Sequence, residues 1–388
     1  MVDATNLRRL KMKKLLALLL IAATLLFTAC SGGKYKEQKS TDEEATIVMT
    51  MKIDGKEYGV RYELYRALFL NYKSAVDGGD NSVWSGENKD EYIARIDSMI
   101  LDRVTEIYAA FAICERIGFD IYSSSVEKKI KQNIKTSIEG GVYGNTIIQG
   151  YESYDDYLAA LKAANLNYSV QVLLFRYAIA VDAIDSYYVG VSSSDDIDLN
   201  MSVGAITYTK DDVKAFYESD ECVRVLRANY QKAISYTPKE KAEALREKIA
   251  SAAASSDDLA EKEDLVAIAI TSSSGNYASA EEVKQGYIMG RYNLERSFYG
   301  EMTDVAFSLE VGEVSRCIDI VTDIENAYYI LYRAEKDEVY FEDNYDNIRY
   351  IYLMNYVGKI SHGVADELRS SVLYSDFLNN IDHAEISM

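Results

Sequence analysis

Hydrophobic residues recur at helical spacing through most of the first half of the chain. An apolar position at every third or fourth residue is typical of a helix that buries one face. The segments with this spacing are residues 57–76, 89–117, 124–139, 151–165 and 168–189. The pattern therefore predicts that a run of helices forms the first part of the protein.

The segment 168–189 is the most apolar of these. A membrane-spanning helix is the alternative to a helix buried in the protein core. Polar and charged side chains interrupt the apolar run, and each of them costs energy in lipid. They are Gln171, Arg176, Asp182 and Asp185. We therefore expect a buried core helix.

Short local signals mark where these elements begin. Residues 47–53 alternate weakly between apolar and polar positions, and Asp54-Gly55 follows as a hairpin-turn pair. Helix starts carry a serine followed three residues later by an acidic residue, which is the capping-box pattern. These pairs are Ser124 with Glu127 and Ser153 with Asp156. These signals predict a strand hairpin followed by capped helices.

The second half of the chain mixes helical and strand patterns. Thr209 with Asp212 forms another capping box, and Pro238 stands in a first helical turn, where its missing N–H costs nothing. The expected order is helix 210–218, strand 222–226, helix 238–252, apolar segment 264–270, turn 271–275, a short helix capped by Ser279 and Glu282, and a glycine turn at 286–290. Residues 302–333 then read as a helix end, a Gly-Glu turn, a strand, a polar turn and a final strand.

These patterns predict an α+β fold that is mostly α. A Ser/Asp-rich stretch at 192–203 is the expected boundary between two domains, and helical spacing returns in the tail after residue 340. The expected division is 1–29 for a signal peptide, 30–45 for a tether, 46–205 for a helical domain, 206–338 for an α+β domain and 339–388 for a C-terminal helical segment that packs back on the helical domain.

The first 29 residues have the layout of an export signal. Basic residues precede a predominantly apolar run from Leu15 to Phe27, and Thr28 and Ala29 lead to Cys30. The run is too short for a membrane span, which takes about 20 residues. The ending resembles a bacterial lipoprotein signal, which implies cleavage before Cys30 and lipidation of that cysteine. This predicts an extracytoplasmic protein held on the outer face of the bacterial cell membrane.

Charge and cysteine content narrow the classes of partner. The net charge is −20, and loss of residues 1–29 would remove five basic residues and one acidic residue. An acidic surface disfavours nucleic acid and anionic lipid headgroups, since both favour Lys and Arg. After Cys30, the cysteines are Cys114, Cys222 and Cys317, without a C-x-x-C pair. A disulfide framework is not expected, although Cys222 with Cys317 stays an open alternative.

No metal or cofactor is expected. Residues 196–200 begin like a calcium-binding loop, but Met201 stands where glycine is required and Thr207 where glutamate is required. The two histidines, His362 and His383, are 21 positions apart, and the chain has no phosphate-binding glycine pattern.

Tyrosine is in excess, with 33 residues against 10 Phe and 1 Trp. Tyrosine offers rigid apolar area with a polar tip, which suits surfaces that bind many partners. Tyrosines recur at helical spacing in two segments, Tyr62, Tyr65 and Tyr72 in the first and Tyr345, Tyr352 and Tyr356 in the second. We consider Tyr62, Tyr65 and Tyr352 candidate peptide-binding residues, with core packing as the alternative.

Residues 302–333 resemble the last third of a parvulin-type peptidyl-prolyl isomerase domain. The motif in that family reads "f-x-x-A-f-x-L-x-x-G-E-v-S", then a strand, then "G-Y-H-I-I", and here its end is Ala327-Tyr328-Tyr329-Ile330-Leu331. The resemblance extends over residues 210–336 and implies an apolar pocket in which two histidines and a Cys or Asp share hydrogen bonds. It also implies that Met289, Met302 and Phe307 bind the peptide.

The catalytic histidines of that family are missing. Tyr329 replaces the second, and two registers of the first strand place either Arg227 or Tyr230 at the position of the first. The Cys or Asp position falls near residues 271–274, which hold neither. The fold is therefore expected without its usual catalytic set.

Residues 53–72 resemble the opening of SurA- and PrsA-like extracytoplasmic foldases. This implies a chaperone for unfolded or nascent secreted polypeptides whose isomerase activity is weak or lost. Two alternatives remain: an active proline isomerase with a pocket that lacks histidine, and a cell-surface adhesin or ligand-binding lipoprotein.

Overall fold

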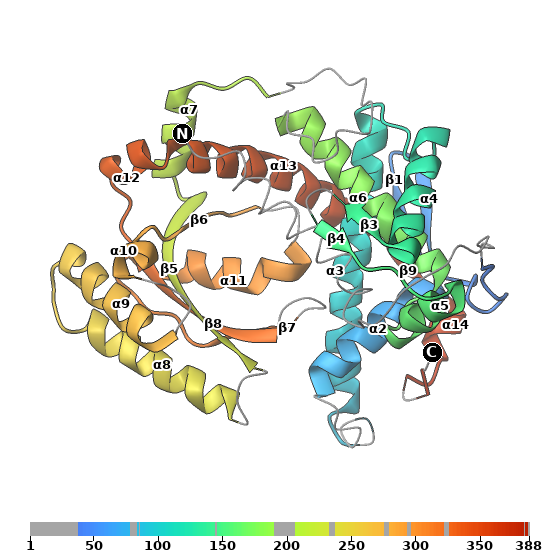
Figure 1. Cartoon of the computed structure of the whole chain (residues 1–388), viewed down its shortest axis with the longest axis horizontal. Coiled ribbons are helices and arrows are strands. Elements are labelled where there is room, and N and C mark those ends of the chain that lie inside the picture. Colours follow the sequence, from blue (N-terminus) through green and yellow to red (C-terminus); the bar gives the residue numbers. More distant parts are fainter. Residues whose placement is uncertain are drawn as a thin grey trace. The chain divides into compact units, whose positions relative to one another are not determined.

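The computed structural model describes most of the chain after the N-terminal segment (Figure 1). The described residues are 38–77, 84, 86–143, 146–189, 206–232, 237–274, 279–292, 296–321, 326–383 and 385–386. The expected signal peptide, Cys30 and the stretch 192–203 lie outside them.

The chain divides into two compact units. Residues Met1–Ala205 and Ile360–Met388 form the first unit, and Ile206–Lys359 form the second. Helices predominate, and the sheets are small and antiparallel, so the predicted fold class, α+β and mostly α, is confirmed at this level. The second unit continues to Lys359, beyond residue 338 where we expected it to end.

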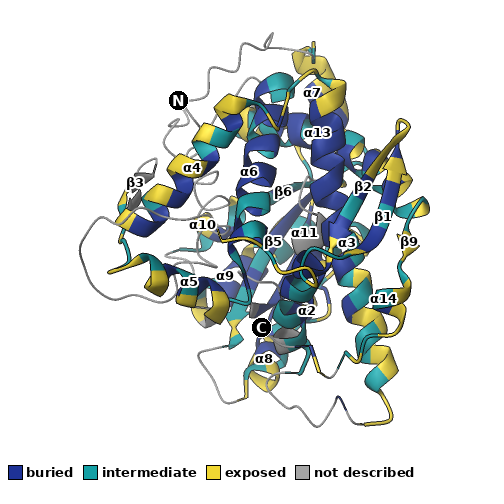
Figure 2. Ribbon diagram, turned by 90° about the vertical axis from the view of Figure 1, so that its right-hand side faces the viewer, coloured by how far each residue is buried: buried dark blue, intermediate teal, exposed yellow. Residues whose placement is uncertain are grey.

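The first unit is built mainly from helices. Those before the unit boundary are α2 (Tyr62–Asp77), α3 (Lys89–Arg116), α4 (Ser124–Glu139), α5 (Tyr154–Ala163) and α6 (Tyr168–Val189). Figure 2 shows α6 largely in the buried colour, as expected for a core helix. Among the residues that the structure describes, no helix combines the length and apolarity needed to cross a membrane.

Two small sheets complete this unit. Strands β1 (Ile47–Ile53) and β2 (Lys56–Arg61) form the expected hairpin, and Asp54 and Gly55 both have positive φ, as a tight turn between strands requires. Strand β9 (Leu373–Tyr374) pairs with the other side of β1, and β3 (Gly141–Tyr143) pairs with β4 (Thr146–Ile148). A four-residue helix, α14 (Asp376–Asn379), follows β9.

Residues before β1 are attached to the first unit, although we expected a tether as far as residue 45. The Glu44 carboxylate accepts a hydrogen bond from Arg66 at 2.7 Å. Glu63, which is buried, accepts hydrogen bonds from the hydroxyls of Ser40 and Ser169. A buried carboxylate requires such donors, so this network holds the chain from Ser40 onward against α2.

The second unit contains an antiparallel sheet of four strands in the order β6-β5-β8-β7. The strands are β5 (Cys222–Gln231), β6 (Tyr287–Gly290), β7 (Ile318–Val321) and β8 (Asn326–Ala334). Its helices are α7 (Lys210–Glu218), α8 (Pro238–Ala253), α9 (Leu259–Ser274), α10 (Ala280–Lys284), α11 (Arg296–Ser308) and α12 (Glu338–Asp343). The long helix α13 (Tyr345–Ser370) begins in this unit and ends in the first.

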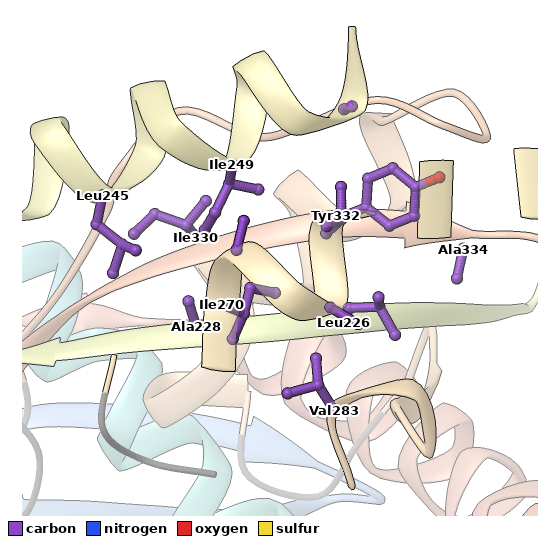
Figure 3. Close-up of a cluster of buried hydrophobic side chains, with 13 residues drawn as sticks. Leu226, Ala228, Leu245, Ile249, Ile270, Val283, Ile330, Tyr332 and Ala334 are labelled. Atoms are coloured by element: carbon purple, nitrogen blue, oxygen red, sulfur yellow. The ribbon is translucent and has the colours of Figure 1, made fainter. Parts of the chain in front are cut away.

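The sheet has a helical layer on each face. Helices α8, α9 and α10 cover one face through a buried cluster that includes Leu245, Ile249 and Ile270 (Figure 3). Helix α11 covers the other face, where Met302 and Ala306 pack on apolar residues of all four strands. A third cluster joins α7 to α12 and to the start of α13, which explains why residues 339–359 belong to this unit.

Several local expectations needed correction. The predicted turn at 271–275 is helical as far as Ser274, because the Thr271 hydroxyl donates to the carbonyl of Ala267 and stays within the helix. The predicted glycine turn at 286–290 is strand β6, which pairs with β5 after Gly286 turns the chain at φ +58°. The cap of α4 is Ser123, one residue before the expected Ser124.

Candidate functional site

Arg227 lies between two tyrosine rings on the α11 face of the second unit's sheet. Its guanidinium carbon is 3.9 Å from the ring centroid of Tyr287 and 5.4 Å from that of Tyr329. Side chains alternate along a strand, and Val223 and Val225 of the same strand belong to the α11-side cluster, so Arg227 shares their face. A guanidinium at these distances makes a cation–π contact.

The structure places Arg227 and Tyr230, the two candidates for the first histidine position, on opposite faces of the sheet. On β5, Arg227 pairs with Leu331 and Tyr230 pairs with Tyr328. Tyr230 alternates with Ala228, which belongs to the cluster on the α8–α10 side of the sheet, so Tyr230 lies on the opposite face. Arg227 therefore shares the face of Tyr329, whereas Tyr230 does not.

The residues expected to bind a peptide surround this pair. Met302 is buried against the sheet, and Met289 and Phe307 are partly buried beside the same cluster. Arg291 places its guanidinium 4.4 Å from the Phe307 ring centroid. The sheet therefore brings five of the predicted site residues onto one apolar face: Arg227, Met289, Met302, Phe307 and Tyr329.

This face has few means for acid–base or nucleophilic chemistry. Arginine stays protonated in proteins, and tyrosine, methionine and phenylalanine offer at most a phenol. Cys317, half-buried, is a free thiol with its pKa raised to about 12, mainly by burial. Cys222 is buried and free, and burial likewise raises its pKa to about 12, so these thiols are not activated and do not form the disulfide left open above.

The three tyrosines predicted to bind peptide lie elsewhere. Tyr352 belongs to the second unit and contacts the rings of Tyr208 and Phe216. Tyr62 and Tyr65 belong to the first unit and are buried, with Tyr65 only 1 % exposed. The assignment of the three tyrosines to peptide binding stays a prediction, and in this structure Tyr62 and Tyr65 are core residues.

A second cluster of aromatic residues, which sequence reasoning missed, surrounds these two tyrosines. Phe69 of α2 stacks on Tyr65 at 6.1 Å between ring centroids, and Trp84 lies at the same distance from Phe69. His383 approaches from the C-terminal segment, with its Nε2 atom 3.0 Å from the Tyr65 hydroxyl. Spacings of three and four residues between Tyr62, Tyr65 and Phe69 were the available signal.

Among the residues that the structure describes, no group of His, Cys, Asp and Glu side chains has the arrangement of a metal site. On the α11 face, the contacts that the structure shows are apolar packing and cation–π contacts.

Comparison with known proteins gives only structural likenesses. No family model matches the chain, and no curated protein matches it. The foldase protein PrsA from Streptococcus pneumoniae str. Canada MDR_19A is 14% identical, with 82% of this chain and 92% of that chain covered and a TM-score of 0.26. PrsA from Bacillus subtilis is 14% identical, with 73% of this chain and 87% of that chain covered and a TM-score of 0.22.

The foldase protein PrsA from Lactococcus lactis is 15% identical, with 88% of this chain and 100% of that chain covered and a TM-score of 0.22. The chain is thus distantly similar to PrsA foldases, and TM-scores this low do not by themselves show a common fold.

Proposed function

We propose that this protein is a membrane-anchored extracytoplasmic chaperone that binds unfolded secreted polypeptides and has weak or no prolyl isomerase activity. The partly exposed residues on the α11 face of the second unit's sheet, which are Arg227, Tyr287, Met289 and Phe307, serve as a platform for apolar, extended segments of the client. The lipid on Cys30 holds the protein at the membrane, and the acidic body stays soluble.

The single observation that carries this proposal is the position of Arg227 between Tyr287 and Tyr329. Rotation about the prolyl peptide bond has a barrier of about 18–20 kcal/mol, and an isomerase lowers it by favouring the twisted amide. The family does this with hydrogen-bonded histidines, whereas this chain's histidines are His362 and His383, both outside residues 206–359. The remaining side chains favour binding of a peptide over catalysis.

A protease-coupled assay on a proline tetrapeptide tests the loss of catalysis. We expect turnover at the background rate for the protein without residues 1–29. Turnover well above background would instead favour the alternative, an active isomerase in which the Tyr329 phenol acts beside Arg227. The proximity of these two side chains, 5.4 Å from guanidinium carbon to ring centroid, is the observation that keeps this alternative open.

Suppression of the aggregation of an unfolded client tests the binding function. We expect suppression at an equimolar ratio, and failure there would favour an adhesin or another surface role. The variant Phe307→Ala removes an aromatic ring from the platform, so suppression should weaken. Ile268→Ala is the matched control, since Ile268 is an exposed apolar residue of α9, which covers the other side of the sheet.

A further inference from the structure

The first unit contains a compact cluster of aromatic side chains, three of them on α2 and the fourth, Trp84, after the end of that helix. We call Tyr62, Tyr65, Phe69 and Trp84 the aromatic cradle. All of them are buried, and the rings of Phe69 and Trp84 are 6.1 Å apart between centroids. Asp77 accepts a hydrogen bond from the indole N–H of Trp84 at 2.7 Å, which fixes the orientation of that ring. The cradle is therefore a preformed surface for aromatic and aliphatic side chains.

The chain's own C-terminal segment, residues 371–383, lies over this cradle. The ring centroid of Phe377 is 5.0 Å from that of Tyr62, and the two rings meet edge to face. The ring of His383 is 5.4 Å from that of Phe69. A single tyrosine links the segment to α3, because the Tyr65 hydroxyl donates to Asp97 at 2.6 Å and accepts from His383 Nε2 at 3.0 Å.

Short backbone pairing attaches the segment to β1, and the buried Leu378, a hydrogen bond from the Ser375 N–H to the Val48 carbonyl and an ion pair between Asp382 and Lys89 add to it. Strand β9 contributes only the pairs of Met49 with Tyr374 and Thr50 with Leu373. Ser371 adds hydrogen bonds between its hydroxyl and the backbone of Lys52. The side chains of β9 face outward, with Leu373 63% and Tyr374 45% exposed. Short edge pairing of this kind opens at a small free-energy cost.

The segment therefore has the properties of a bound peptide. It is extended at β9, adds a strand to the edge of β1, and inserts Phe377 and His383 among aromatic rings. Strand addition combined with side-chain pockets is a recurring way in which proteins bind extended peptides. An external peptide with an aromatic residue near a short β-forming stretch fits the same surface.

We propose that the C-terminal segment is an internal competitor, and that an unfolded client binds the aromatic cradle and the edge of β1 by displacing it. This inference rests on the proposed chaperone function and names the second surface that a client uses. The occupant is an extended segment with aromatic side chains. Displacement lowers the apparent affinity for clients by the fraction of molecules in which the segment is undocked.

A reversible lock tests this displacement. Thr50 and Leu373 are opposite each other in the antiparallel pair, and Cα atoms of such pairs lie about 4.5–5.5 Å apart, within the range that a disulfide spans. The variant Thr50→Cys with Leu373→Cys should hold the segment in place when oxidised and free it when reduced. Suppression of client aggregation is measured in both redox states, with the unmodified chain treated in parallel.

We expect the oxidised variant to suppress aggregation about tenfold less efficiently than the reduced variant. Equal suppression in the two states would overturn the displacement proposal and leave the chaperone function standing. Suppression in neither state, and none by the unmodified chain, would overturn the chaperone function as well. The two failures are therefore distinguishable.

The two histidines of the chain provide a matched pair of substitutions. His383→Ala removes the hydrogen bond to Tyr65 and the ring contact with Phe69, so client binding should tighten severalfold. His362→Ala removes an imidazole that lies on α13, before the C-terminal segment begins, and should leave client binding unchanged. Trp84 is the only tryptophan, so its emission reports on the cradle, and it should shift to the red in His383→Ala alone. Identical behaviour of the two variants would count against the proposal.

Discussion

The two units both gather tyrosines, but they differ in what covers the rings. In the first unit, Tyr62 and Tyr65 lie under the C-terminal segment, with Phe377 and His383 against them. In the second unit, Tyr287 and Tyr329 flank the cation of Arg227 on a sheet face. An excess of aromatic residues therefore does not by itself identify a binding surface, because the neighbouring groups decide whether the rings are occupied.

The two units also differ in how firmly their parts are held together. The second unit contains a largely buried ion pair in which the Nη1 and Nη2 atoms of Arg224 donate to the two carboxylate oxygens of Glu263 at 2.8 and 2.6 Å. The first unit closes its sheet with two pairs of residues in β9. We expect the second unit's platform to be rigid and the first unit's cradle to open.

The largest expected effect concerns the ion pair between Arg224 and Glu263 in the second unit. Arg224→Ala leaves the largely buried carboxylate of Glu263 without its partner, which should cost about 3 kcal/mol in the free energy of unfolding. Arg316→Ala removes an exposed ion pair with Glu301 and should cost about 1 kcal/mol or less. Urea unfolding followed by circular dichroism measures both. Similar midpoints for the two variants would remove the distinction between framework and surface.

A second test concerns the contact between β6 and α13 inside the second unit. A Cβ atom at Gly290 would lie 2.8 Å from the side-chain oxygen of Asn355, which is buried and accepts a hydrogen bond from the backbone N–H of Tyr292. Gly290→Ala should therefore destabilise the unit by about 1–3 kcal/mol. Thermal unfolding checks this, and an unchanged transition would mean that the edge strand adapts.

Acid should weaken the docking of the C-terminal segment on the aromatic cradle. Burial lowers the pKa of His383 below its ordinary value of 6.5, opposed by the nearby Asp97 and Asp382 carboxylates and assisted by Lys89. A lowered histidine pKa means that docking is fully stabilised above pH 6.5 and loses that contribution as the pH falls through the lowered pKa. The Tyr65 phenol stays protonated throughout.

Client binding should therefore tighten severalfold between about pH 7.5 and pH 5, with a red shift of Trp84 emission. His383→Ala should lose this dependence, and His362→Ala should keep it. A pH profile that is the same in the wild type and in His383→Ala would assign the change to other groups.

The smallest expected effect is a gain in stability. Gly363 is in the part of α13 that belongs to the first unit, and nothing lies within 4 Å of a Cβ atom built there. Gly363→Ala should raise the free energy of unfolding by about 0.5–1 kcal/mol, because it reduces the freedom of the unfolded chain and restores helix propensity. Urea unfolding checks this value, and destabilisation would indicate a contact that helix geometry does not explain.

Local patterns predicted most of the elements because the forces that fix them are local. Ser153, Thr209 and Ser279 each cap the helix that their acidic partner indicated. The cap of α4 was misplaced by one residue, since consecutive serines at 123, 124 and 125 make sequence alone ambiguous. Extended backbone at Ser123, with ψ 156°, selects it over its neighbours.

Pairings between strands far apart in the chain could not be predicted from the sequence. The two residues of β9 are too few to show alternation, and their partner strand is near the other end of the chain. The placement of Arg227 and Tyr230 on opposite faces likewise needed the pairing of β5 with β8, because a shift of one residue exchanges the two faces. Burial of Tyr65 depends partly on His383, so the helical spacing on α2 could not reveal it.

The pairing of β1 with the C-terminal segment has a consequence for biosynthesis. Lys52 and Ser371, which share hydrogen bonds there, are 319 positions apart. During synthesis, β1 leaves the ribosome long before its neighbour exists, and closing so long a loop is slow. The edge of β1 and the rings beneath stay open until residues 371–383 emerge, so the newborn chain passes through the open form that a client later requires.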